Sequence, residues 1–222
     1  MRWVKSLGRY VRVGSRFNGD GHYSSGMTST QPTRRDGEAT RQRLLRAALE
    51  LYTTVGFRAT TTPAIAARAG VAEGTIYRHF SGKEHLLNEV FRGAQHWGTS
   101  IVRETETEQA TPGRLQQIAR RLLETAARDA ALTRMLLRRR DEQHLDERSR
   151  EAEREFRDAL QHVMAAGASE GAVRSGPAEL WTDLWLALVA FVAERVGARE
   201  WAPDAPPVGM ALDAAWDTIA AR

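Results

Sequence analysis

Apolar residues recur at helical spacing along most of the chain. Leu44, Ala48, Leu51 and Val55 are separated by steps of three and four, which place them on one face of an α-helix. No stretch of useful length alternates apolar and polar residues as a half-buried strand would. The pattern predicts an all-α fold of about nine helices, over residues 36–56, 63–69, 73–80, 81–103, from 111, near 132–136, 141–166, 178–197 and 208–221.

The helix expected over 178–197 is apolar on several sides. Leucine, valine, tryptophan and phenylalanine side chains cover well over half of its circumference. A helix of this kind must be buried on more than one side. One face can pack against the protein's own core, so we expect a partner to cover the other.

A turn between two short helices stands out in the stretch 61–83, TTPAIAARAGVAEGTIYRHFSGK. Thr62 is expected to cap the first helix, with Pro63 at its first position, where the missing N–H costs nothing. Gly70 supplies the left-handed residue that ends this helix, and the next runs over 73–80. Two helices joined by a tight glycine turn are the layout of a helix-turn-helix, a DNA-binding motif.

The starts of the neighbouring helices carry different capping signals. Ser81 and Glu84 have the spacing of a capping box at the start of the fourth helix. Ala72 cannot cap the second helix of the motif, a loss of roughly 1 kcal/mol. We therefore expect that helix to depend on the packing of Ile76 and Phe80.

Composition and charge divide the chain into three parts. Residues 1–35 show no period and form an expected disordered basic extension. We favour translated sequence upstream of a start at Met27 over a flexible arm that follows DNA. No apolar stretch of a targeting segment occurs there. Residues 1–92 hold fifteen basic and seven acidic residues, whereas residues 93–222 hold seventeen and twenty-one. A basic end on an acidic body suits a protein that meets a polyphosphate at one end, with a DNA-binding domain over 36–92 and a regulatory body over 93–222.

The sequence lacks the residues that several classes of function require. The chain has no cysteine, which excludes disulfides and thiolate metal sites. His144 and His162 are too far apart in sequence for a short metal motif, so we expect no metal site and no cofactor. The uncharged apolar run over 184–193 is too short to span a bilayer, so we expect no membrane partner. No nucleophile–base set, phosphate loop or paired carboxylates suggest an enzyme.

The motif resembles one family in particular. The residues that carry the resemblance are Thr61-Thr62, Ile65-Ala66, Ala69-Gly70-Val71, Gly74-Thr75-Ile76-Tyr77, His79-Phe80, Lys83-Glu84 and Leu86-Leu87. Over about residues 38–92 the chain resembles the TetR/AcrR family of bacterial transcriptional regulators. Ala72 departs from this family, in which serine is frequent at that position, and the part before the first helix is longer than the family needs.

The resemblance implies that the second helix of the motif enters the major groove. Arg78 is a candidate for two hydrogen bonds to guanine, and Tyr77 and His79 are candidates for phosphate contacts. We expect Glu73 to face away from the phosphates or to read a cytosine amine. Lys83, one of two lysines against thirty arginines, is expected to contact a phosphate as a compact charge. The full set of candidate DNA contacts is Thr62, Glu73, Gly74, Thr75, Tyr77, Arg78, His79 and Lys83.

The resemblance also implies a homodimer and an effector. The last two helices are expected to form a four-helix bundle across a two-fold axis, so that the dimer reads a palindromic operator. The candidate interface residues are Trp181, Leu184, Leu188, Val192, Leu212 and Trp216. Candidates to line a pocket for a small apolar or aromatic effector, each of which can also be plain core, are Leu122, Met135, Phe156, Trp181, Trp185 and Phe191. The leading hypothesis is a ligand-responsive repressor in the bacterial cytoplasm, associated with the nucleoid; the alternative is a regulator of the same fold, repressor or activator, without a small-molecule effector.

Overall fold

The computed structural model describes residues 34–105, 110–138 and 142–221, all of them in helices or short connections. The helices are α2 (Arg34–Thr54), α3 (Thr62–Ala69), η1 (Glu73–Arg78), α4 (Lys83–Glu104), α5 (Thr111–Arg128), α6 (Ala130–Leu137), η2 (Glu142–His144), α7 (Glu147–Ser169), α8 (Ala178–Gly197) and α9 (Pro206–Ile219). Within these ranges the only β-type pairing is an isolated bridge between Val173 and Ala220. The expected all-α fold is confirmed, with eight α-helices and η1 making up the nine; η2 is a single 3-10 turn. The extension expected over 1–35 lies outside the described residues, apart from positions 34 and 35, which belong to α2.

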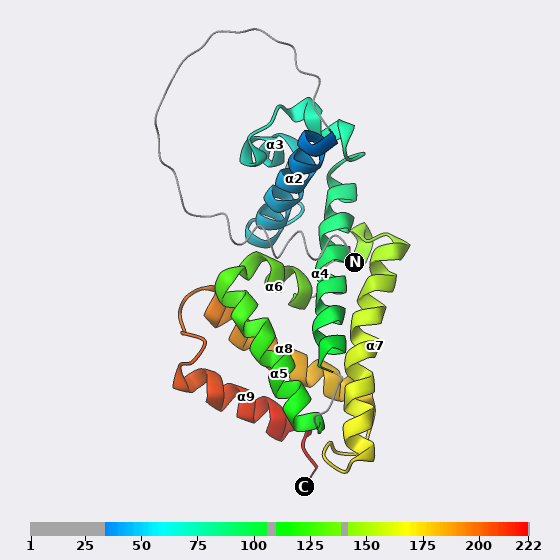
Figure 1. Cartoon of the computed structure of the whole chain (residues 1–222), viewed down its shortest axis with the longest axis vertical. Helices are drawn as coiled ribbons and strands as arrows, with labels where there is room; N and C mark the ends of the chain where they lie inside the picture. Colours follow the sequence, from blue (N-terminus) through cyan, green and yellow to red (C-terminus); the bar gives the residue numbers. More distant parts are fainter. Residues whose placement is uncertain (1–33, 106–109, 139–141, 222) are drawn as a thin grey trace.

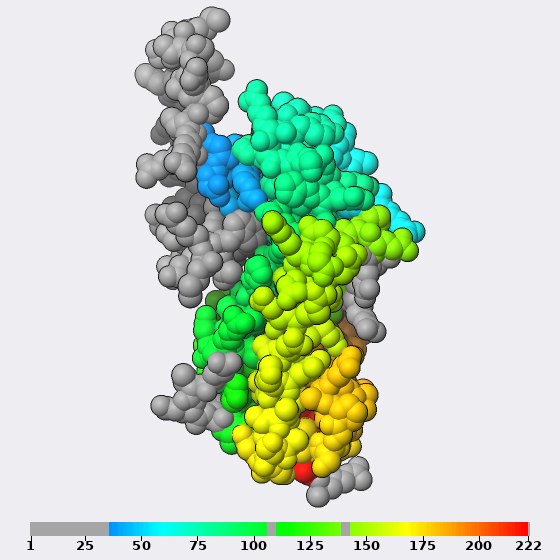
Figure 2. Space-filling view, turned by 90° about the vertical axis from the view of Figure 1, so that its right-hand side faces the viewer, coloured from blue at the N-terminus to red at the C-terminus, as the bar shows by residue number. Residues whose placement is uncertain are grey.

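The helices form a small head at one end of a longer body (Figure 1). The head consists of α2, α3 and η1, and α4 runs from it into the body beside α7. Helix α7 covers one side of the body (Figure 2). Helices α8 and α9 pack on each other and on α5, away from the head. None of the helices described is long and apolar enough to cross a membrane.

One apolar core runs through both parts. It joins buried residues of the head, such as Ile65 and Ile76, to buried residues of the body, such as Leu122 and Met135. A smaller cluster closes the corner between α5, α8 and α9. The head is therefore not a separately packed unit, because its hydrophobic core continues into α4 and the body.

Helix starts are where the sequence-based expectations fail. Thr61, not Thr62, caps α3, with its hydroxyl accepting from the Ala64 N–H at 3.3 Å, so Pro63 takes the second helical position. The capping box at Ser81 is wrong: Gly82 precedes α4 and offers no side chain. The His85 imidazole instead accepts from the Ser81 N–H at 3.2 Å. Gly82 therefore leaves α4 without a side-chain cap, and the His85 bond holds the residue before it.

The start of α7 also differs from its expected place. The helix begins at Glu147 rather than near 141, after the short turn η2. The Asp146 carboxylate caps it by accepting from the Ser149 N–H at 2.8 Å. An aspartate at this position stabilises a helix start and favours a break in the chain just before it.

Candidate DNA-binding site

The turn between α3 and η1 is fixed by backbone geometry. Gly70 has φ 66° and ψ 42°, and its N–H bonds to the carbonyls of Ala66 and Ala67. Only glycine adopts this left-handed conformation without strain. The predicted role of Gly70 is therefore confirmed, and the turn sets the angle at which η1 leaves α3.

Packing rather than capping holds η1. Ala72 makes no side-chain cap bond, as expected. Ile76 and Phe80 are buried in the head, and the Arg41 guanidinium of α2 lies over the Phe80 ring, 5.1 Å from its centre. The element is a 3-10 helix that ends at Arg78, so it is tighter and shorter than the helix expected over 73–80.

The polar side chains of η1 lie on its outer surface. Tyr77 is 59% exposed, and Glu73 and Arg78 are exposed as well, while Thr75 and His79 are half-buried. The Thr62 hydroxyl at the start of α3 donates to Glu73 Oε1 at 3.4 Å. The structure thus brings Thr62 and Glu73 together across the turn, next to the other candidates on η1.

Lys83 has partners inside the head. Its Nζ donates to the carbonyls of Thr60 and Phe57, at 3.2 and 3.4 Å, and lies 4.5 Å from the centre of the Phe57 ring. The Lys83 carbonyl accepts from the Tyr52 hydroxyl at 2.6 Å, and burial raises the pKa of that phenol. Lys83 therefore ties the loop after α2 to the start of α4, a role that its rarity in the sequence did not reveal.

Arg68 lies in the motif, but its charge is paired with Glu50. Its Nε and Nη2 donate to Glu50 Oε2 at 2.8 and 2.6 Å, and Arg46 donates to the other oxygen at 2.8 Å. Burial alone would raise the pKa of the Glu50 carboxyl, but the two arginines lower it. The sequence did not predict this ion pair, because eighteen residues separate Glu50 from Arg68.

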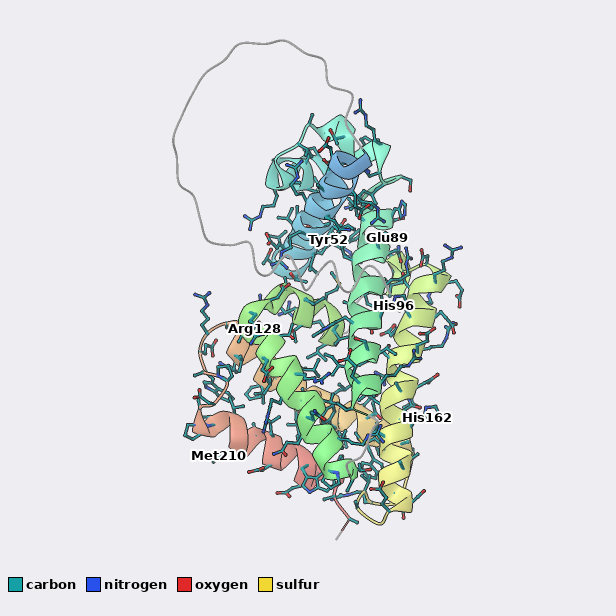
Figure 3. The ribbon with its side chains drawn as sticks, in the orientation of Figure 1. Tyr52, Glu89, His96, Arg128, His162 and Met210 are labelled. Carbon is teal, nitrogen blue, oxygen red and sulfur yellow. The ribbon has the colours of Figure 1, made fainter. Side chains whose placement is uncertain are left out.

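Two sets of ion pairs join the head to the body. Arg46 Nη1 of α2 donates to Asp129 Oδ2 at 2.5 Å, and Asp129 Oδ1 caps α6 by accepting from the Leu132 N–H at 3.2 Å. In the second set Arg41 of α2 pairs with Glu89 of α4, labelled in Figure 3. Arg92 bonds that carboxylate at 2.5 Å and also reaches Asp146, the cap of α7. Burial on its own would raise the pKa of Glu89, but hydrogen bonds from Arg92 and Arg41 lower it.

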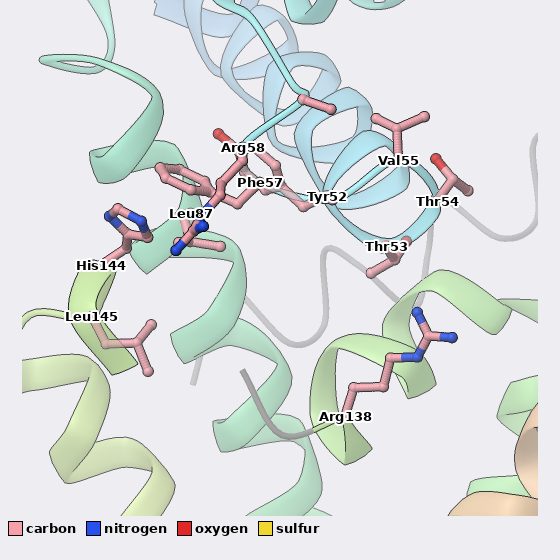
Figure 4. Close-up of a pocket in the computed structure, with 12 residues that line it drawn as sticks. Tyr52, Thr53, Thr54, Val55, Phe57, Arg58, Leu87, Arg138, His144 and Leu145 are labelled. Atoms are coloured by element: carbon pink, nitrogen blue, oxygen red, sulfur yellow. The ribbon is translucent and has the colours of Figure 1, made fainter. Parts of the chain in front are cut away.

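A cavity of about 530 Å³ separates the end of α2 from the body on one side of this junction (Figure 4). It is lined by the loop after α2, by Arg138 after α6 and by His144 of η2. The His144 ring packs on Phe57 with 4.3 Å between centres, and its Nδ1 lies 3.2 Å from Glu84 Oε1. On this side the head therefore meets the body through Phe57 and His144, with an open space beside them.

Known proteins match the head. Residues 44–90 fit the model of the tetR family of bacterial regulatory proteins. The head of the chain therefore resembles the TetR family. Over 64 residues it is 42% identical to the HTH-type transcriptional regulator SrpR of Pseudomonas putida. This match covers 29% of this chain and 30% of SrpR. The chain is 36% identical over 72 residues to the transcriptional repressor KstR2 of Mycobacterium tuberculosis, covering 32% and 36%. The matches thus span less than half the length of these relatives.

Solved TetR-family structures match the whole fold. A TetR-family transcription regulator from Marinobacter aquaeolei superimposes with a TM-score of 0.71 over 86% of this chain and 100% of its own, at 18% identity. The SmeT–triclosan complex superimposes with a TM-score of 0.57 over 82% and 92%, at 22% identity. At these identities the likeness shows that the body shares the family fold.

The body distributes the expected pocket and interface residues differently. Leu122, Met135, Phe156 and Trp185 are buried core, whereas Phe191 is 47% exposed and packs edge-on against Trp201. Phe191 is therefore a surface residue, not part of an internal pocket. Val192 is fully buried with Leu123 and Ala126, which removes it from the expected interface.

The remaining interface candidates are accessible to different degrees. Leu184 is 39% exposed on α8, and Leu188 and Trp181 are half-buried beside it. Leu212 and Trp216 of α9 are half-buried and line a cavity of about 200 Å³ with Trp185. His96 and His162 lie on different helices (Figure 3), and within the ranges described no three potential metal ligands gather at one point.

Proposed function

We propose that the protein is a homodimeric repressor that binds a palindromic DNA operator and responds to a small ligand. The observation that carries the DNA-binding part is the outer surface of the head, where Glu73, Tyr77 and Arg78 are exposed on a helix anchored by Ile76 and Phe80. A firmly packed helix with exposed polar side chains can enter the major groove. The names of SrpR and KstR2 support a regulatory role. Such a protein acts where bacterial DNA lies, in the cytoplasm, and needs no enzymatic activity or cofactor.

We assign base reading to Glu73, Thr75 and Arg78 of η1. Arg78 reaches guanine, and Thr75 contacts a neighbouring base edge. The Glu73 carboxylate, oriented by the Thr62 hydroxyl, accepts from a cytosine amine. A Cβ built on Gly74 would meet nothing within 4 Å, so its small size is not needed for packing and lets DNA approach the backbone closely.

We assign the remaining candidates to the phosphates. Tyr77 and His79 flank the base-reading residues, and Thr62 adds the N–H groups of a helix start. Lys83 uses two of its three N–H donors on carbonyls of the head, which leaves one for a phosphate.

Binding to DNA selected from a random pool tests these roles. We expect Arg78→Ala to relax base preference at one position, which costs roughly 1–3 kcal/mol of discrimination. We expect Lys83→Ala to weaken binding to all sequences and to lower the salt slope by about one unit. Arg68→Ala is the matched control, since that guanidinium already bonds Glu50. Equal effects of the first two variants on selected and random DNA would contradict the division of roles.

The proposed homodimer rests on an apolar stripe of α8 that the described residues leave open. Leu180, Leu184 and Phe191 are 46%, 39% and 47% exposed at helical spacing, and Met210 of the adjoining helix α9 is exposed too (Figure 3). A second copy that covers this stripe would give a two-fold dimer, and such dimers read half-sites about one helical turn of DNA, 34–36 Å, or a multiple apart. We expect Leu184→Asp to give monomers by sedimentation, whereas Val55→Asp, at an exposed apolar position of the head, leaves the dimer intact. A dimer that survives Leu184→Asp would remove α8 from the interface.

Response to a ligand is the part that distinguishes the two hypotheses of regulation. The SmeT–triclosan complex shows a small molecule held by a protein of this fold. A ligand that prefers one spacing of the heads shifts the dimer towards or away from its operator. A thermal-shift screen with apolar and aromatic compounds tests this: a compound that stabilises the protein and releases the operator supports the effector. A screen without hits, with operator binding intact, favours the regulator without a small-molecule effector.

A further inference from the structure

One cavity of the body contains an unusual polar group. The cavity has a volume of about 320 Å³ and lies between α4, α6, α7 and α8. Gln95 of α4 lines it and is only 2% exposed. Gln95 Oε1 has no hydrogen-bond partner within the described part of the chain. Buried polar groups are nearly always paired, because leaving one unpaired opposes folding, so this oxygen calls for an explanation.

The packing around Gln95 is close apart from the cavity. One turn further along α4, a Cβ added to Gly98 would lie 2.7 Å from Leu136 Cδ1 and 2.9 Å from two carbons of the Phe156 ring. Leu136 and Phe156 therefore press directly against α4 and form an apolar wall of the cavity. On this side the space beside Gln95 is bounded by closely packed groups.

The charged residues of the cavity leave no clear excess of either sign. Arg157 of α7 and Asp183 of α8 both line it and form an ion pair with each other. Glu153 and Arg138, also lining residues, carry opposite charges. A charged ligand would gain little from such a set, whereas a neutral one keeps the Arg157–Asp183 pair intact.

We propose that this cavity binds a neutral ligand with an aromatic or other compact apolar body and one hydrogen-bond donor, such as a phenol or alcohol. The donor bonds Gln95 Oε1, and the apolar body packs on Phe156 and Leu136. This inference rests on the proposed ligand response, for which it names the chemical class. Because Gln95 is on α4, the helix that also carries Glu89 at the junction with the head, the ligand contacts the element that connects the two parts.

The test compares three probes that differ at one position. We would measure binding of 4-phenylphenol, its methyl ether and biphenyl-4-carboxylate to the full chain without DNA, by calorimetry. The phenol donates a hydrogen bond, whereas the ether and the carboxylate only accept. We expect the phenol to bind about tenfold more tightly than the ether, the effect of one hydrogen bond in an apolar site. An ether or carboxylate that binds as tightly as the phenol overturns the proposal.

Substitution of Gln95 supplies the second measurement. Gln95→Met keeps the volume and removes the oxygen, so we expect it to raise the melting temperature of the free protein and to remove the preference for phenol over ether. Gln116→Met, in α5 beside a different cavity, should leave that preference unchanged. An unchanged preference in Gln95→Met would show that the donor binds elsewhere. Operator binding without phenol binding refutes the ligand class alone, whereas phenol binding without any DNA binding refutes the proposed function alone.

Discussion

The pair of Arg46 and Asp129 allows a quantitative test of how the head is fastened to the body. Arg46 is on α2 of the head and its side chain is 41% exposed, while the Asp129 side chain at the start of α6 is 3% exposed. Arg46→Met keeps most of the apolar stem and removes the charge. The buried carboxylate then retains the Leu132 N–H as its remaining partner among those described.

The expected cost follows from this geometry. Removing one partner of a fully buried ion pair costs about 3–5 kcal/mol. Here one partner is partly solvated and the carboxylate keeps its cap bond, so we expect Arg46→Met to cost about 1–3 kcal/mol. Asp129→Asn retains a cap oxygen but no charge. The stability loss of the double variant should be smaller than the sum of the two single losses by about 1 kcal/mol or more, because both substitutions remove the same contact.

Urea unfolding followed by tryptophan fluorescence, at one fixed protein concentration, measures these differences. Arg68→Met is the control, because Arg68 also pairs with Glu50 but is mostly exposed, which predicts a cost below about 1 kcal/mol. If Arg46→Met costs no more than Arg68→Met, or if the losses at positions 46 and 129 are additive, the pair does not fasten the head and the reasoning fails.

Two further predictions concern pH and packing. The pKa of Glu89 is lowered in the folded protein, so its contribution to stability is present above about pH 4.3, the usual glutamate value, and is lost as the pH falls through the folded value. The stability gap between the protein and Glu89→Gln should therefore narrow in acid; a gap that is constant from pH 7 to pH 3 would contradict the pairing. Gly98→Ala forces a Cβ against Leu136 and Phe156, which costs about 1–3 kcal/mol, partly offset by about 1 kcal/mol of helix propensity. Gly209→Ala meets nothing within 4 Å and should stabilise by up to about 1 kcal/mol, so equal melting temperatures for the two variants would refute the close packing.

Features that depend on neighbours in sequence could be predicted from the sequence. The period of apolar residues gave the helix order, and the range 178–197 agrees with α8. Gly70 and Ala72 behave as expected because turn geometry and capping involve only a few consecutive residues. The family resemblance of the head has the same origin, since its motif is continuous in the chain.

Competition between local partners explains the errors at helix starts. Thr61 and Thr62 are both good caps, and no local rule chooses between them. Ser81 lost its expected role because Gly82 follows it and the His85 ring reaches back to its N–H. Where several nearby groups can satisfy the same N–H, only the folded geometry decides.

Contacts between distant residues were decided by the tertiary structure alone. The carbonyls that bind Lys83 are 23 and 26 residues away from it, and Asp129 is 83 residues from Arg46. The Gln95 oxygen, which has no partner among the residues that the structure describes, and the burial of Val192 likewise depend on how several helices meet. The sequence by itself determined a helical protein with a helix-turn-helix at its basic end, because periodicity and turn chemistry are local. The tertiary structure decided which charged side chains stay exposed on the head and where the body contains a cavity, because burial and ion pairing are set by residues that meet only when the chain folds.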